Sequence, residues 1–156
     1  MATPTETVLA RRWRMDVNMA TFEAPDWQLF PAITEFQPQW PPNIEESTTY
    51  DSDGWQENEK TGQEWSIEAT FNRKATPDST AFSPVHEKLR TASFAYGAAS
   101  KVYVRFYDRN GLPEAYTGRV LVEWEDQGGE STDLGQVQVT LTGDGPLTAI
   151  ANPVTP

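Results

Sequence analysis

One stretch decides the fold: Gln136-Val137-Gln138-Val139-Thr140-Leu141-Thr142, in which polar and apolar side chains alternate at every position. Successive side chains of a β-strand point to opposite faces, so this alternation predicts a strand with one face on a core and the other in water. Burial of a single face is typical of antiparallel sheets. The stretch therefore predicts an antiparallel β-protein.

The same period of two recurs elsewhere in the chain. It covers residues 13–19, 64–72, 101–107 and 119–125. A further strand is expected from Ala32 to Gln37, opened by Pro31 and closed by Pro38. Asn110-Gly111 and Gly128-Gly129 are turn signals between successive strands. Together these segments predict a mainly β fold, an antiparallel sandwich or barrel.

One helix is expected between the strands. Ser83 suits the N-cap, Pro84 suits the first helical position, and Gly97 marks the expected end. The apolar positions follow at helical spacing: Val85, Leu89 and Ala92. Such a stripe predicts a helix that flanks the sheet and packs on it.

The composition limits the possible functions. The chain has 156 residues, enough for one domain spanning 1–156, and carries 12 basic against 23 acidic residues, a net charge of −11. This balance argues against a nucleic-acid-binding surface, which needs clustered Lys and Arg. The chain has no cysteine and one histidine, His86, which excludes disulfides, thiolate zinc sites and multi-histidine centres. We expect a surface or half-buried structural role for His86, no metal or cofactor, and no enzymatic activity.

The termini show no targeting signal. Residues 1–10 are polar and predict an N-terminal arm rather than a secretory signal, and residues 146–156, with three prolines, predict an extended C-terminal tail that is poorly ordered alone. No run of apolar residues reaches the length of a membrane span. The sequence thus predicts a protein kept inside a cell and away from membranes.

The segment 40–63 differs from the rest of the chain. It begins Trp40-Pro41-Pro42, contains the turn signal Asp53-Gly54, and lacks sustained apolar alternation. Its residues expected to take part in assembly are mostly acidic: Glu45, Glu46, Tyr50, Asp51, Asp53, Trp55, Glu57 and Glu59. An excursion this long is usually functional or disordered, and a solvating linker needs no aromatic residues. We expect a long arm or hairpin that orders on a partner, with plain disorder as the alternative.

The positive charge is densest at Arg11, Arg12 and Arg14. A solvated strand edge explains such a cluster, and three charges are too few for nucleic-acid binding. A third interpretation is that the cluster contacts the acidic arm of a neighbouring copy. Opposite charges on separate surfaces of one chain favour head-to-tail association into rings or filaments.

Other chemistry is poorly supported. Asp51-Ser52-Asp53-Gly54 resembles the start of a calcium loop, but Trp55 stands where an oxygen ligand is needed. Glu68, Glu123 and Glu125 could serve a hydrolase, yet such residues on a sheet face are far more often solvated. A carbohydrate-binding β-sandwich remains the main alternative function, with Trp40, Trp55 and Trp27 as stacking platforms.

The order of these elements resembles the major tail tube protein of long-tailed, non-contractile bacteriophages. The similarity covers roughly residues 8 to 145. Its local patterns are Tyr50-Asp51-Ser52-Asp53-Gly54-Trp55 in the arm and Lys60-Thr61-Gly62-Gln63-Glu64-Trp65 at the entry to a strand. The chain departs from that family in lacking an appended immunoglobulin-like domain and in its short tail.

The resemblance implies a β-sandwich protomer with one flanking helix. Six protomers would form a ring whose joined sheets line a channel, and the rings would stack into a tube through which DNA passes without specific binding. The arm would contact adjacent subunits or the next ring, and both termini would help lock the stack. The implied partners are further copies and other tail proteins (tape measure, tail terminator, distal tail), and the implied locations are the virion tail and, during assembly, the bacterial host cytoplasm.

A channel for DNA must not bind DNA. Basic side chains on its wall would release counterions from the phosphates and hold the DNA, whereas carboxylates and small neutral polar groups would not. Two polar strand faces have this chemistry and are the expected lining: Glu64, Ser66, Glu68 and Thr70, and Gln136, Gln138, Thr140 and Thr142. Lys101 and Arg105 make the strand at 101–107 a poorer candidate.

Overall fold

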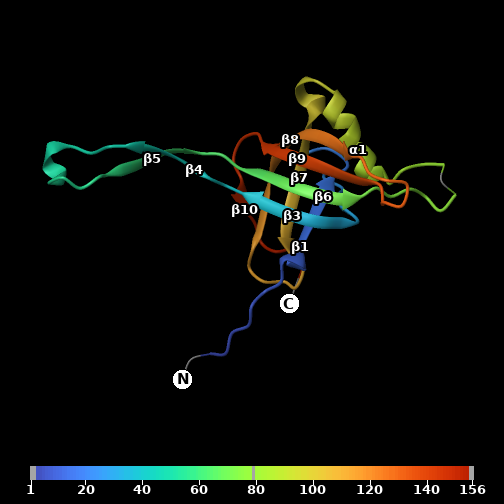
Figure 1. Ribbon diagram of the computed structural model, residues 1–156, viewed down its shortest axis with the longest axis horizontal. Helices are drawn as coiled ribbons and strands as arrows, with labels where there is room; N and C mark the ends of the chain where they lie inside the picture. Colours follow the sequence, from blue (N-terminus) through green and yellow to red (C-terminus); the bar gives the residue numbers. More distant parts are fainter. Residues whose placement is uncertain (1–2, 79, 155–156) are drawn as a thin grey trace.

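A curved β-sheet forms the body of the protein, with a helix on one side and a long hairpin projecting from it (Figure 1). The computed structural model describes residues 3–78 and 80–154. The strands are β1 Trp13–Asn18, β2 Trp27–Leu29, β3 Ile33–Gln39, β4 Pro42–Glu46, β5 Asn58–Gln63, β6 Ser66–Asn72, β7 Lys101–Asp108, β8 Ala115–Gln127, β9 Gln136–Gly143 and β10 Thr148–Ala149. The helical segments are α1 Pro84–Phe94 and the 3-10 turns η1 Ala10–Arg12, η2 Tyr50–Ser52 and η3 Gly97–Ser100.

The main sheet is antiparallel and runs in the order β2-β1-β7-β8-β9-β6-β3, with β10 beside β8. It curls until its two ends approach, since the rings of Trp13 in β1 and Phe36 in β3 lie 6.0 Å apart. Side chains rather than backbone hydrogen bonds close this seam. The prediction of a mainly β, antiparallel, barrel-like protomer is confirmed.

The core lies between the concave face of the sheet and α1. Alternate residues of the strands fill it, for example Ile67, Val139 and Leu141, which are fully buried. Leu89 of α1 is also fully buried, so the predicted apolar stripe of the helix does pack on the sheet. The helix ends at Phe94, before Gly97, which has a φ of +65° and opens η3.

The strand expected to close at Pro38 continues to Gln39. Pro38 lies opposite Ile67 of β6. This position is possible because β3 is the last strand of the sheet, where a residue without an N–H can face the unpaired edge. The short strand β2 was not expected, since three residues carry too little alternation to be recognised.

His86 is the clearest correction to the sequence-based expectation. Its ring is fully buried rather than on the surface or half-buried, and it lies between Phe30 and Phe71 with ring centroids 4.9 and 4.3 Å away. Its Nε2 lies 3.0 Å from the carbonyl oxygen of Pro31. Helical spacing alone did not reveal that the loop before β3 crosses this side of α1.

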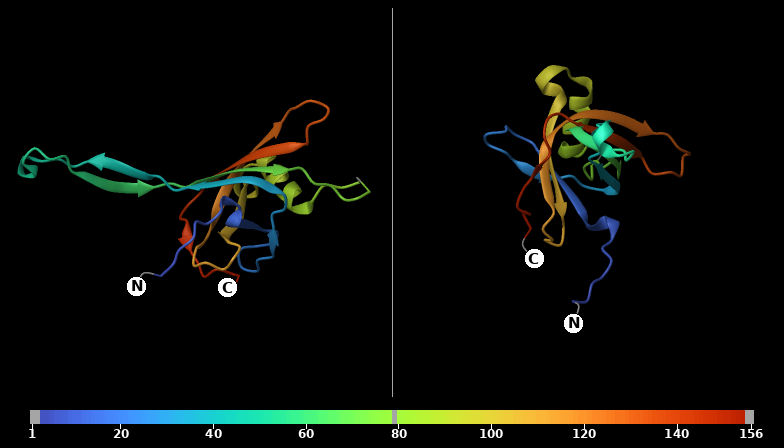
Figure 2. Two further views of the ribbon diagram at one scale, coloured as in Figure 1. Left: turned by 60° about the horizontal axis from the view of Figure 1, so that its bottom comes forward. Right: turned by 90° about the vertical axis from the view of Figure 1, so that its left-hand side faces the viewer.

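Part of the C-terminal tail is held against the body. Residues 148–149 form β10 beside β8, and the Asn152 amide donates hydrogen bonds to the carbonyl groups of Asp108 and Leu112. Residues 3–9 leave the body on the same side as this tail (Figures 1 and 2). Residues 1–2 of the expected N-terminal arm and 155–156 of the expected tail lie outside the described part.

The described residues show neither a membrane-spanning helix nor a metal-binding cluster. None of their helices combines the length and apolar character needed to cross a membrane. Nor do three or more His, Asp or Glu side chains gather there in a way that could hold a metal ion.

Candidate functional site: a polar sheet face and a protruding arm

Strands β6 and β9 bring most of the predicted channel residues together. Their register sets Ser66 opposite Thr142, Glu68 opposite Thr140, and Thr70 opposite Gln138. These side chains point away from the core, because the intervening residues, such as Ile67 and Leu141, are buried. Gln136 lies at the end of the same face and donates a hydrogen bond to Asn72.

The flanking strands extend this face. Beyond β6, β3 sets Glu35 opposite Thr70 and Gln37 opposite Glu68. Beyond β9, β8 sets Glu123 opposite Thr140 and Glu125 opposite Gln138. From the sequence, Glu123 and Glu125 were expected only as hydrolase candidates, and Glu35 and Gln37 were not expected at a site, although each pair shows the strand period of two.

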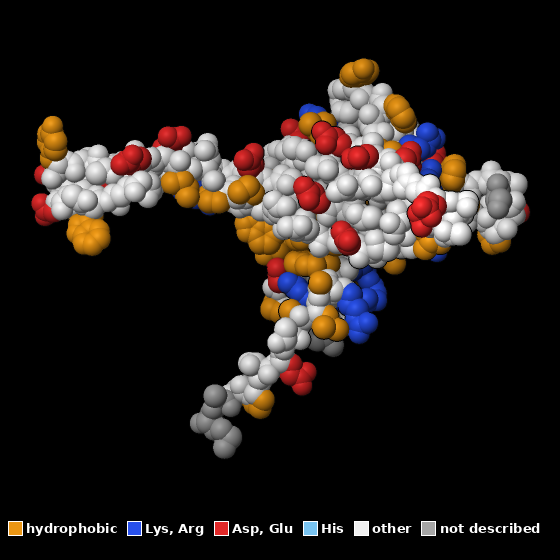
Figure 3. Space-filling model, viewed as in Figure 1, with side chains coloured by type: hydrophobic (Ala, Val, Ile, Leu, Met, Phe, Trp, Pro, Cys, Tyr) orange, Lys and Arg blue, Asp and Glu red, His pale blue; other side chains and the backbone are white. Residues whose placement is uncertain are grey.

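The outward positions of these four strands carry one basic side chain, Arg119 in the first half of β8, and this residue is paired with Asp144. The polar face, as we call it, consists of residues 35, 37, 39, 66, 68, 70, 72, 121, 123, 125, 127, 136, 138, 140 and 142, and none of them is Lys or Arg. Figure 3 shows scattered carboxylates, in red, among uncharged atoms over the body of the sheet. Glu64 lies beside the polar face, at the root of the arm, and is exposed.

The strand judged a poor channel candidate, β7, carries neutralised charges. Lys101 of β7 and Arg119 of the adjacent strand β8 both contact a carboxylate oxygen of Asp144, at 3.0 and 2.7 Å. The hydrogen bond from Lys101, with the charge of Arg119, lowers the pKa of Asp144 below its ordinary value. Arg105 likewise contacts buried Asp16 at 2.8 Å. Positive charge next to the polar face is therefore compensated within the protomer.

The arm is a two-stranded hairpin that continues β3 and β6 outward (Figure 2). Strand β4 follows β3 after Trp40 and Pro41, and β5 leads into β6 through Glu64 and Trp65. At the root, the Glu64 N–H donates to the carbonyl oxygen of Pro41 at 3.3 Å. The Gln63 amide donates a hydrogen bond to the carbonyl oxygen of Trp40. The segment expected as a long arm or hairpin is thus a hairpin in the structure.

Like charges face each other across the arm. Glu45 lies directly opposite Glu59, and the N–H of Ser47 donates to the carbonyl oxygen of Glu57 at 2.8 Å, so three acidic residues gather along one stretch. Like charges on opposed strand residues destabilise a hairpin. The arm therefore has negative charge that its own protomer does not neutralise, apart from Lys60 opposite Ile44.

The tip of the arm presents two large aromatic side chains to solvent. Tyr50 is fully exposed and Trp55 is 79% exposed. The tip is ordered by local hydrogen bonds: the Thr49 N–H donates to Oγ of Ser52 at 3.1 Å, and the Trp55 N–H donates to the carbonyl oxygen of Ser52 at 3.0 Å. Asp51 and Asp53 lie between the two aromatics, so the tip is both aromatic and acidic.

The predicted arginine cluster is divided by the structure. Arg12 contacts Asp108 at 3.2 Å and Glu114 at 3.1 Å, and the carboxylate of Asp108 is fully buried. Arg12 is thus held within its own protomer. Arg109, which the sequence analysis did not consider, joins the cluster by donating a hydrogen bond to the carbonyl oxygen of Arg11 at 3.2 Å. The arginines available to another molecule are Arg11, Arg14 and Arg109.

The residues of the alternative functions are spread apart. Trp55 lies at the arm tip, Trp40 packs on Tyr116 at the root, and Trp27 lies beneath the Arg105 guanidinium at 4.8 Å. These rings share no surface. Glu68 in β6 and Glu123 in β8 both lie opposite Thr140 of β9, one on each side of it. They are therefore two strand spacings, or about 10 Å, apart on an open sheet.

Comparison with known proteins supports the resemblance at the level of fold. Neither a protein-family model nor a curated protein matches the sequence. A chain in the tail of an empty gene transfer agent particle with C6 symmetry is 12% identical, covers 93% of this chain and 100% of its own, and has a TM-score of 0.70. A chain of the SPP1 tail tube is 12% identical, covers 94% of this chain and 81% of its own, and has a TM-score of 0.67.

A third structure comes from a different assembly. A chain of the anti-feeding prophage baseplate, solved with six-fold symmetry, is 11% identical, covers 96% of this chain and 98% of its own, and has a TM-score of 0.60. The sheet, the helix and the connections between them therefore follow an architecture used in tail assemblies. The chain has the fold of the tail tube subunits that it resembles.

Proposed function

We propose that this protein is a structural tail subunit that assembles into six-membered rings, which stack into a tube enclosing a channel for DNA. The observation that carries the proposal is the polar face, on which carboxylates and neutral polar groups of β3, β6, β9 and β8 align, while the one basic side chain on the outward side of these strands, Arg119, is paired with Asp144. The tail-tube fold supports it.

The polar face suits the wall of such a channel. DNA binds a surface when basic groups displace its condensed counterions. The one basic group on the outward side of these four strands, Arg119, is already paired with Asp144. Its carboxylates, such as Glu68 and Glu123, repel phosphates at distances within the Debye length of about 8–10 Å. Its amides and hydroxyls bind water and hold no net charge. A DNA molecule would pass such a wall without being retained.

The remaining surfaces would serve assembly. The arm would contact an adjacent subunit or the next ring, and residues 3–9 and 146–154 would lie against neighbours in the stack. Other tail proteins (tape measure, tail terminator, distal tail) would meet the ends of the tube, placing the protein in a virion tail after assembly in the bacterial cytoplasm. In this role the protein needs no catalytic group or cofactor.

Electron microscopy tests the proposal. Purified protein, concentrated and negatively stained, is expected to show rings or tubes with a central channel, and averaged end views are expected to show six-fold symmetry. A protein that remains monomeric at every concentration, as judged by sedimentation velocity, would contradict it.

A further inference from the structure

We propose that a basic and apolar cleft between β1 and β3 binds the arm tip of a second copy of this chain. This inference rests on the proposed self-assembly and specifies one of its contacts. In this contact the guanidinium groups of Arg11, Arg14 and Arg109 bind the acidic tip. The rings of Tyr50 and Trp55 insert into the cleft.

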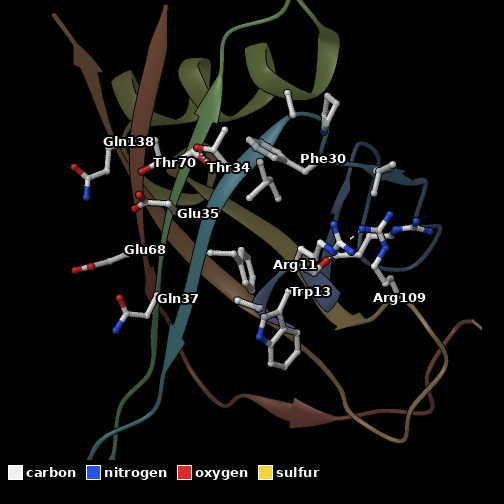
Figure 4. A pocket seen from close by; sticks show the side chains of 17 residues that line it. Arg11, Trp13, Phe30, Thr34, Glu35, Gln37, Glu68, Thr70, Arg109 and Gln138 are labelled. Atoms are coloured by element: carbon white, nitrogen blue, oxygen red, sulfur yellow. Dashed lines mark hydrogen bonds between the residues drawn. The ribbon is translucent and has the colours of Figure 1, made fainter. Parts of the chain in front are cut away.

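The cleft lies at the open seam of the sheet. It has a volume of about 780 Å³, with Trp13, Leu29 and Phe36 among its apolar lining residues. Arg11 and Arg109 stand together at one rim, whereas Glu35 and Glu68 stand at the other (Figure 4). An acidic ligand in this cleft would be drawn to the arginine rim and repelled from the glutamate rim, which fixes its orientation.

The arginines at this rim carry uncompensated charge. Among the described residues, the basic side chains without an ion-pair partner are Arg11, Arg14, Lys60, Lys74, Lys88 and Arg109. Three of these line the one cleft. Holding several like charges together is unfavourable, and an anionic partner relieves the repulsion.

The arm tip matches this cleft in chemistry. Tyr50 is fully exposed and Trp55 is largely exposed. Exposed aromatic residues of this kind often dominate the binding energy when a partner buries them. Asp51 and Asp53 supply carboxylates for the guanidinium groups. The tip is already ordered by its own hydrogen bonds, so binding would cost little conformational entropy.

The geometry requires a second copy. The arm continues β3 and β6 directly away from the body, so its own tip cannot return to the cleft (Figure 2). From Pro42 to Tyr50 the extended chain reaches roughly 30 Å, which carries the tip well away from its own body. A second cleft, at the arm root, is lined by Trp40, Tyr116 and Leu147 and offers Glu64 but no basic side chain. The acidic tip is therefore matched to the first cleft rather than the second.

Disulfide trapping tests the contact, because the natural chain has no cysteine. One variant carries Gln56→Cys at the tip, an exposed residue beside Trp55, and Leu29→Cys in the cleft, where Leu29 is 50% exposed. The control carries Gln56→Cys with Ala149→Cys, an exposed residue of the root cleft. Oxidised assemblies of the first variant are expected to give a ladder of cross-linked chains on a denaturing gel, and the control none. No ladder, or an equal ladder in the control, overturns the inference.

A charge swap gives a second, independent test. The tip variant Asp51→Lys/Asp53→Lys and the cleft variant Arg11→Glu/Arg109→Glu should each fail to assemble alone, because like charges then meet. An equimolar mixture should recover assembly, since each altered tip meets an oppositely charged cleft. Assembly of either variant alone at wild-type concentration contradicts the contact. If the wild-type protein itself never assembles, the proposed function is wrong. If the wild-type protein assembles and the charge swap has no effect, the proposed function stands and only the contact between tip and cleft is wrong.

Discussion

The indole ring of Trp65 lies directly against the α-carbon of Gly143, so that a side chain at position 143 would overlap it. Gly118 of β8 is close to the same ring and equally lacks space for a β-carbon. The indole N–H donates to the carbonyl oxygen of Gly145 at 2.9 Å. Trp65 directly precedes β6 in the short link from β5, so these contacts fasten the root of the arm to the body.

Replacement of Gly143 by Ala should therefore destabilise the protein. The added methyl group would displace the indole of Trp65, and such overpacking costs typically about 1–3 kcal/mol. Urea denaturation followed by tryptophan fluorescence measures the free energy of unfolding. The matched control is Gly128→Ala, because nothing lies within 4 Å of a β-carbon at that turn position. Equal effects of the two substitutions would show that the contact is not tight.

Stability should fall in mild acid because of His86. Burial, the largest effect, lowers the pKa of His86 below its ordinary value of 6.5. The folded state therefore binds fewer protons than the unfolded state once the pH falls below 6.5. The stabilisation is complete above that pH and is lost below it, with a slope of at most about 1.4 kcal/mol per pH unit.

The matched variant for this prediction is His86→Gln, whose amide can still donate a hydrogen bond to the carbonyl oxygen of Pro31. We expect it to be less stable than wild type at pH 7.5, with a smaller loss of free energy of unfolding between pH 7.5 and 5.5. Urea titrations at both pH values measure the difference. Parallel pH profiles for the two proteins would remove His86 as the cause.

The polar face should become a DNA-binding surface when its charge is reversed. Tubes of a Glu68→Lys/Glu123→Lys/Glu125→Lys variant are expected to retain double-stranded DNA that wild-type tubes release. Because each subunit contributes several phosphate contacts, the affinity should fall on the order of 10³-fold or more between about 50 and 200 mM salt. Co-sedimentation with labelled DNA measures it.

The control for the polar face is Glu23→Lys/Asp26→Lys/Glu130→Lys, which makes the same change in net charge at exposed positions elsewhere. These tubes should retain much less DNA than tubes of the polar-face variant. Equal retention by both variants would mean that net charge, rather than the position of the face, governs binding.

The arm should be dispensable for folding and necessary for assembly. Residues 44–60 can be replaced by Asn-Gly, a two-residue turn that joins Asn43 to Thr61, whose Oγ1 donates to the carbonyl oxygen of Asn43 at 3.3 Å. None of the replaced residues belongs to the core. The free energy of unfolding should change by less than about 0.5 kcal/mol.

Sedimentation velocity should show this shortened protein as a monomer at concentrations where wild type forms rings or tubes. A longer or shorter loop changes stability only slightly, so a large loss would show that the arm supports the fold. Unchanged tubes would exclude an assembly role for the arm.

The strands and the helix could be predicted because they depend on local patterns. The alternation at 136–142 and the stripe Val85, Leu89 and Ala92 each lie within one element, and their periods follow from backbone geometry. The arm at 40–63 could be predicted because it lacks such a period. The edge position of β3, which accommodates Pro38, depends on the order of strands in the sheet and was not predictable from that segment.

The candidate sites were harder to predict than the strands, because they depend on contacts between residues far apart in the sequence. The sequence does not indicate an ion-pair partner for Arg12, yet this residue contacts Asp108, which lies 96 residues away. Arg109 joins Arg11 only because the end of β7 lies beside η1. His86 is buried because Phe30 and Phe71 from other elements enclose it. Side chains far apart in the chain meet only when the whole sheet has closed.

The sequence by itself determined the class of fold, the helix, the excess of acid and the presence of an arm, because these follow from residue type and spacing. The tertiary structure alone decided which charges remain free and which strand faces align. The register of β3, β6, β9 and β8 joins scattered Glu, Gln and Thr residues into one polar face. The physical reason is that backbone geometry acts over a few residues, whereas packing and ion pairing act between residues brought together by folding.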